Sequence, residues 1–148
     1  MKTHPYLRAY LAGIFVPTLM LPVILTVFIV ARILIQVPMP IERILIFPMA
    51  IVPSLFGLWN VFWLGSHERW HQPIGLHGAV LPLVMAPIGA LVGTSLGVLQ
   101  IGSHGIVWFQ SCSIPYMWIV PEFVAAMAAY YLVWKYVVGF LNRVLGIA

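Results

Sequence analysis

The sequence predicts an all-α membrane protein, a bundle of four transmembrane helices in a single integral membrane domain that covers residues 1–148. Its composition and four long apolar stretches are the basis of this prediction. Of all residues, 63% are hydrophobic and only 7% are charged, whereas a soluble domain carries roughly 25% charged residues. Because so few charges cannot cover a water-soluble fold, we expect lipid to surround most of the chain.

Each apolar stretch is long enough to cross the hydrocarbon core, which takes a helix of about 20 residues. The stretches cover residues 9–35, 44–65, 74–101 and 114–134. Prolines and polar residues separate the first three, and an uncharged loop, residues 102–113, precedes the last. Beyond Trp134 we expect the helix to continue as an interfacial C-terminal extension, residues 135–148.

The basic residues set the expected orientation. Four spans place both tails and the second loop on one face, which holds Lys2, Arg8, Arg69, Lys135 and Arg143. The opposite face holds Arg32 and Arg43. The positive-inside rule therefore predicts cytoplasmic termini, and we expect the protein in a bacterial inner membrane. The first apolar run is too long for a cleaved signal peptide, whose apolar core has ~7–15 residues.

Prolines recur in pairs early in every predicted span. Shifting the first helical hairpin by 65 to 68 residues aligns its prolines with those of the second. They are Pro17, Pro22, Pro48, Pro53, Pro82, Pro87, Pro115 and Pro121. The pattern indicates two parallel repeats, each a proline-kinked helical hairpin. The alternative is that prolines are simply more frequent in membrane helices than in soluble ones.

Glycines four residues apart mark the third predicted span. Gly89, Gly93 and Gly97 form two successive Gly-xxx-Gly steps, and small residues at this spacing form a groove that admits another helix backbone. Packing within the bundle and docking of a partner subunit both fit this groove.

Five residues, His67-Glu68-Arg69-Trp70-His71, match the H-E-x-x-H pattern. Histidines four apart on a helix can bind one Zn²⁺ while the glutamate polarises a water molecule. The motif resembles that of zincins and intramembrane metalloproteases, which implies Glu68 as the catalytic residue and His67 and His71 as ligands. Intramembrane zinc proteases usually add an aspartate, and this chain has none. A third ligand would have to be His77, His4 or Glu122, so we expect no stoichiometric zinc.

The histidines allow a second reading as cofactor ligands. We expect His4, His67, His71 and His77 at the cytoplasmic interface, and His104 on the opposite side. Neutral imidazole binds zinc, haem iron and chlorophyll magnesium, which makes His77 and His104 candidate cofactor ligands. Histidine also tolerates the wet headgroup zone, and the sequence requires no cofactor.

Glu122 lies about two turns into the last span, roughly 10 Å along the helix axis. Ionisable groups in a span are costly and usually face a partner or a water-filled path. We expect a structural ion pair with Arg32, near the same membrane face. An ion pathway and contact with another subunit are the alternatives.

The function expected from these patterns is a non-catalytic accessory or structural subunit of a larger membrane complex, of the respiratory or photosynthetic type. Its expected partners are membrane lipids and other membrane subunits. The scattered basic residues form no patch for nucleic acid. One alternative is a small oligomeric transporter or channel, with a polar path through Asn60, Thr94 and Glu122. The other is a membrane zinc metalloprotease that uses His67, Glu68 and His71.

Overall fold

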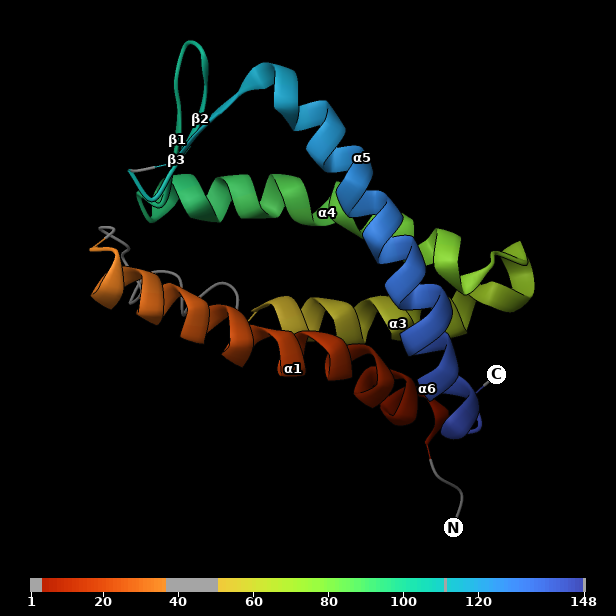
Figure 1. Cartoon of the computed structure of the whole chain (residues 1–148). Coiled ribbons are helices and arrows are strands. Elements are labelled where there is room, and N and C mark those ends of the chain that lie inside the picture. The colour runs from red at the N-terminus through yellow and green to blue at the C-terminus, as the bar shows by residue number, and fades with distance from the viewer. Residues whose placement is uncertain (1–3, 37–50, 111, 148) are drawn as a thin grey trace.

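The computed structural model describes residues 4–36, 51–110 and 112–147, and most of these are helical (Figure 1). The helices and strands follow in this order: α1 (Pro5–Leu34), α3 (Val52–Trp70), α4 (Ile74–Ser95), β1 (Leu99–Ile101), β2 (Gly105–Trp108), β3 (Cys112–Pro115), α5 (Tyr116–Leu132), η2 (Val133–Val138) and α6 (Gly139–Val144). The segments α5, η2 and α6 form one continuous helix, in which η2 is a π-helical turn.

Three of the described helices are long and apolar enough to cross a membrane, Pro5–Leu34, Ile74–Ser95 and Tyr116–Val144. This supports the prediction of a membrane protein, but a bundle of four spans is not confirmed. The predicted second span, residues 44–65, begins outside the described residues. Its described helix, α3, ends in the polar run Ser66–Arg69. The apolar part of α3, residues 52–65, is about 21 Å long and does not cover a ~30 Å core alone.

The two helices of the first hairpin, α1 and α3, approach closely because each has a glycine at the crossing. A Cβ atom on Gly13 would lie 2.5 Å from the Phe56 carbonyl oxygen and 2.9 Å from the Gly57 Cα atom. A Cβ atom on Gly57 would lie 2.5 Å from the Tyr10 ring. No real Cβ fits at these distances, so the crossing requires both glycines.

The second hairpin also begins with a glycine contact, but its partner is a large side chain. The Gly78 backbone lies directly against the Trp134 side chain, so a Cβ atom at residue 78 would overlap it. Trp134 is fully buried and forms the core with Phe56, Leu81 and Val138. The hydrophobic core therefore lies where α3, α4 and η2 meet.

The first helices of the two hairpins bury equivalent positions. Gly13 and Gly78 are 65 residues apart, as are Pro17 and Pro82, and all four are buried. This spacing equals the offset that aligns the prolines of the two predicted repeats. The second helices do not follow this spacing. Gly13 contacts Gly57 and Gly78 contacts Trp134, but Gly57 and Trp134 are 77 residues apart. The duplication therefore stays a prediction, with support from α1 and α4.

A three-stranded antiparallel sheet replaces the end of the predicted third span and the predicted loop 102–113. The sheet has the order β1-β2-β3, with Gln100 opposite Val107 and Val107 opposite Ser113. The predicted boundaries at residues 101 and 114 are thus wrong, because α4 ends at Ser95 and α5 begins at Tyr116. The prediction of an all-α fold is wrong in this segment too, where β-branched and aromatic side chains favour strands.

Gly97 is the physical reason for the early end of α4. It adopts the left-handed conformation at φ 66°, which glycine reaches without a steric penalty. The Val98 amide donates to the Gly93 carbonyl at 2.9 Å, and the Gly97 amide donates to the Thr94 carbonyl at 3.0 Å. These two hydrogen bonds form a Schellman motif, which terminates a helix.

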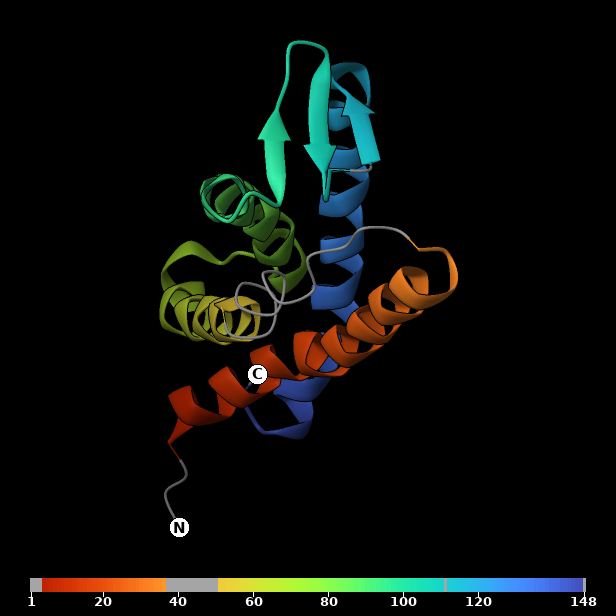
Figure 2. The same ribbon diagram turned by 90° about the vertical axis from the view of Figure 1, so that its left-hand side faces the viewer.

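The start of α1 and the end of α6 lie at one end of the molecule, near the end of α3 and the start of α4 (Figure 1). The Arg8 guanidinium donates from Nη1 to the Leu145 carbonyl at 2.6 Å, which fixes the end of α6 to the start of α1. We call this the termini end. The sheet projects from the opposite end (Figure 2), which we call the sheet end.

Candidate functional site

The H-E-x-x-H residues do not share one helical face. His67 and Glu68 belong to α3, but this helix ends at Trp70 and His71 adopts a left-handed conformation at φ 49°. The His67 ring stacks on Trp63 at a centroid distance of 4.8 Å, and its Nδ1 lies 2.8 Å from the Leu64 carbonyl. Since a carbonyl only accepts, Nδ1 carries the proton. The predicted geometry of a zinc-protease helix is therefore not formed.

His77 is buried between α3 and α4, and its position at the cytoplasmic membrane interface stays a prediction. Its side chain is only 3% exposed. His77 Nε2 donates to the Trp59 carbonyl at 3.0 Å, and Trp59 Nε1 donates to the His77 carbonyl at 2.9 Å. The two rings stack at 4.7 Å. His77 therefore joins α3 to α4. Its position in the sequence does not indicate this role.

The remaining histidines lie apart from this pair. His4 precedes α1 and is exposed, and His104 is exposed in the turn between β1 and β2. Within residues 4–36, 51–110 and 112–147, no three His, Cys, Asp or Glu side chains gather where they could hold a metal ion. The structure thus brings together neither the predicted zinc ligands nor the predicted cofactor ligands His77 and His104.

A buried pair of asparagines, which the sequence analysis did not find, joins three helices near the termini end. Asn60 of α3 and Asn142 of α6 are both fully buried. Asn60 Nδ2 donates to Asn142 Oδ1 at 2.8 Å, and Asn142 Nδ2 donates to Asn60 Oδ1 at 3.1 Å. Asn60 Nδ2 also donates to the Ala9 carbonyl of α1 at 2.8 Å. Amide side chains act in this way as polar links between membrane helices.

The predicted glycine groove is not formed as a continuous surface. Gly93 faces the side chain of Leu99 in β1, with its virtual Cβ 3.1 Å from the Leu99 Cβ. Gly97 lies beyond the end of α4, where it supplies the left-handed turn. Gly89 lies in α4 and is partly exposed. The glycines that bring helices together are instead Gly13, Gly57 and Gly78.

The predicted ion pair between Arg32 and Glu122 is not formed. Arg32 lies in the last turn of α1, Glu122 lies in the second turn of α5, and both side chains are exposed. In the part of the chain that the structure describes, Glu122 makes no hydrogen bond or ion pair. Its carboxylate is therefore exposed without a polar partner among the described residues.

The spacing of charges along the last helix limits how this helix can cross a membrane. Glu122 and Lys135 are 13 residues apart on one continuous helix, a distance of about 20 Å. The hydrocarbon core is about 30 Å thick, so a membrane crossing by this helix would place at least one of the two charges within the core. Lys135 has a long side chain that can reach the headgroups, and its ammonium lies 5.5 Å and 5.2 Å from the ring centroids of Tyr131 and Tyr136. Glu122 has no such stabilisation.

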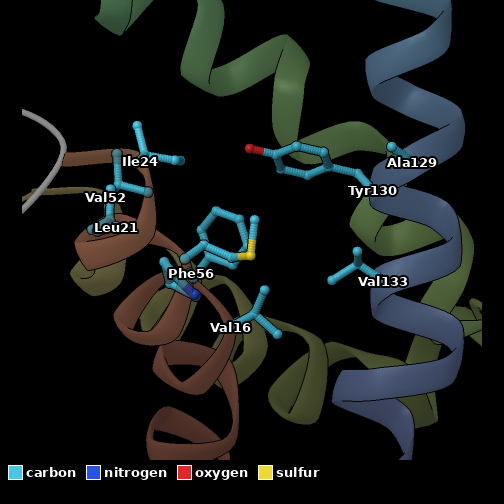
Figure 3. Close-up of a pocket in the computed structure, with 10 residues that line it drawn as sticks. Val16, Leu21, Ile24, Val52, Phe56, Ala129, Tyr130 and Val133 are labelled. Carbon is cyan, nitrogen blue, oxygen red and sulfur yellow. The ribbon is translucent and has the colours of Figure 1, made fainter. Parts of the chain in front are cut away.

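An apolar cavity of about 290 Å³ lies where α1, α3 and α5 meet. Figure 3 shows Val16, Leu21 and Ile24 on one side of it, and Tyr130 and Val133 on the other. The Tyr130 hydroxyl donates to the Met85 sulfur at 3.7 Å. No acidic or basic side chain lines this cavity, so it offers apolar contact and no acid–base chemistry.

In comparisons with protein-family models, curated proteins and solved structures, no match to this chain was found. The function is therefore inferred from the arrangement of its own residues.

Proposed function

We propose that this protein is a non-catalytic accessory subunit of a larger membrane complex and that the first half of its last helix, α5, docks onto a partner subunit. The observation that carries the proposal is the Glu122 carboxylate, which is exposed on an apolar membrane helix and makes no hydrogen bond or ion pair within the described chain. A carboxylate in this position is costly unless a partner group compensates it.

Small exposed residues near Glu122 support the proposal of a docking helix. Trp118, Glu122, Ala125 and Ala129 follow one another at helical spacing and are all exposed, so they form one face of α5. Ala125 and Ala129 are a pair of small residues four apart, which lets a second helix approach closely. We call these four residues the α5 docking face. A cationic or hydrogen-bond-donating side chain of the partner would compensate Glu122.

The two alternative functions gain no support from the geometry. The proposed polar path of a transporter needs Asn60, which is fully buried in its pair with Asn142. It also needs Thr94, whose hydroxyl donates to the Ala90 carbonyl of its own helix at 2.7 Å. A zinc protease needs His67 and His71 on one face, and α3 ends between them.

The test is extraction of the full chain from its native membrane in mild detergent, followed by quantification of the proteins that copurify. We expect Glu122→Gln to reduce the amount of retained partner by at least about tenfold, because removing one member of a buried polar pair costs 2–5 kcal/mol or more. Glu68→Gln is the matched control. Glu68 is also an exposed carboxylate, but it lies at the termini end of α3, and its replacement should leave the partner bound.

Two results would contradict the proposal. One is equal retention of the partner by wild type, Glu122→Gln and Glu68→Gln. The other is a chain that retains its partners after Glu122→Gln but loses an ion flux across reconstituted membranes, which would favour the transporter.

A further inference from the structure

A second, amphipathic pocket lies at the termini end, between the start of α1 and the last turns of α3. Its volume is about 400 Å³. Tyr6 contributes one wall from α1, and α3 contributes Phe62, Gly65, Ser66, Arg69 and Trp70. None of these residues belongs to the α5 docking face, so this pocket is independent of the proposed function.

Arg69 supplies the pocket with a positive charge that the protein does not neutralise. Its side chain is exposed, and across residues 4–36, 51–110 and 112–147 no hydrogen bond or ion pair involves its guanidinium. The neighbouring Glu68 does not pair with it. A guanidinium presents a planar set of donors that matches the oxygens of a phosphate, so Arg69 is available for an anionic ligand.

Tyr6 contributes a second donor to the pocket. The Tyr6 hydroxyl makes no hydrogen bond in the described chain, and the residue is 57% exposed. The Ser66 hydroxyl, by contrast, already donates to the Phe62 carbonyl at 2.7 Å. Arg69 and Tyr6 therefore both have donors that a ligand can use.

The remaining walls are aromatic and apolar. Trp70 is 56% exposed and packs edge-on against Phe62, with ring centroids 6.0 Å apart. Tyrosine and tryptophan gather where the bilayer meets water, because one side of each ring system is apolar and the other is polar. A ligand in this pocket thus meets a charge at one side and apolar rings at the other, as a phospholipid does at its headgroup.

Gly65 keeps the pocket open. A Cβ atom built on this glycine would meet no other atom within 4 Å, so the helix tolerates a side chain there. A larger residue at this pocket-lining position would reduce the open volume, which offers a way to block the pocket.

We propose that this pocket binds an anionic phospholipid, with its phosphate on Arg69 and Tyr6 and its upper acyl chain against Phe62 and Trp70. Basic pockets between membrane helices bind acidic lipid headgroups by the same combination of charge and apolar contact. Arg8 and Arg143 lie at the same end of the molecule, and their charge adds to the preference for an anionic lipid over a zwitterionic one.

The experiment measures the thermal stability of the full chain in detergent while phosphatidylglycerol, phosphatidylcholine or inorganic phosphate is added. We expect phosphatidylglycerol to raise the melting temperature and the other two additives to have little effect. Arg69→Gln should weaken the apparent affinity for phosphatidylglycerol about fivefold, the factor that corresponds to ~1 kcal/mol per basic residue. Gly65→Leu should abolish the shift and leave the lipid-free melting temperature nearly unchanged.

Arg143→Gln is the control, because it removes a positive charge at the same end but outside the pocket, and it should keep most of the lipid response. Three results would overturn the proposal: equal shifts with both lipids, an equal shift with inorganic phosphate, or an equal loss of response in Arg143→Gln and Arg69→Gln.

Discussion

The two parts of the last helix differ in composition and in their surroundings: the more apolar part, α5, is the less buried one. In the half that runs from Val133 to Val144, Trp134, Val138 and Asn142 are fully buried against α1, α3 and α4. In α5, which precedes it on the same helix, no residue is buried. The difference shows that hydrophobicity alone does not reveal which part of a membrane helix packs against its own chain.

Specific shapes and polar pairs produce the contacts of the buried half. Trp134 fits against the bare backbone of Gly78, and Asn142 pairs with Asn60. The π-helical turn η2 contains Trp134 and precedes Asn142, and such turns shift the side chains that follow them around the helix axis. The α5 half contacts α4 but buries none of its residues in the described chain, and it carries small residues and one carboxylate, which is why we assign a further partner to another subunit.

Replacing Gly78 with a larger residue should have the largest effect on the stability of the buried half. We expect Gly78→Leu to destabilise the fold by at least about 3 kcal/mol, the upper end of typical overpacking penalties, because the new side chain would overlap Trp134 near its Cβ atom. The measurement is the melting temperature of the detergent-solubilised chain. Gly65→Leu is the matched control, since the space beside Gly65 is open. Equal melting temperatures for the two variants would contradict the packing described for the second hairpin.

Breaking the asparagine pair should have a smaller but clear effect. Asn142→Leu removes both hydrogen bonds to Asn60 and leaves buried amide groups without that partner, at a cost of about 1–3 kcal/mol. Adding Asn60→Leu should recover part of this loss, and a double-mutant cycle in thermal unfolding measures the coupling. Gln100→Leu, which replaces an exposed amide on β1, should change stability by less than ~0.5 kcal/mol. Purely additive losses from the two asparagines would show that they do not form a pair.

The sequence predicts the helical membrane character and three of the long helices because both depend on local hydrophobicity. It does not predict where α4 ends, because the spacing of Gly97 is also typical of a Gly-xxx-Gly groove. Only the structure shows that Gly97 ends the helix in a left-handed conformation. The sheet escapes prediction for a related reason: Leu99 and Ile114 look like the ends of membrane spans, and the uncharged residues between them look like a loop.

The candidate sites were harder to predict than the helices because they depend on contacts between distant segments. His77 and Trp59 exchange hydrogen bonds over 18 residues, and Asn60 and Asn142 do so over 82. Nothing local marks such pairs, although an asparagine within an apolar segment is a signal for an interhelical link. The sequence marks Glu122 because a lone carboxylate in a predicted span is rare. It does not identify the partner of Glu122, because a similar predicted depth in the membrane does not bring the Arg32 side chain into contact.

Site-specific photo-crosslinking in the native membrane tests the central claim most directly. A photoreactive residue at Ala125, on the α5 docking face, is compared with one at Val144, which is 65% exposed on the buried half of the same helix. We expect position 125 to yield one discrete protein adduct with a second polypeptide and position 144 to yield only lipid adducts. Lipid adducts alone at position 125 would show that α5 faces the bilayer, and the account of this protein as a docked subunit would be wrong.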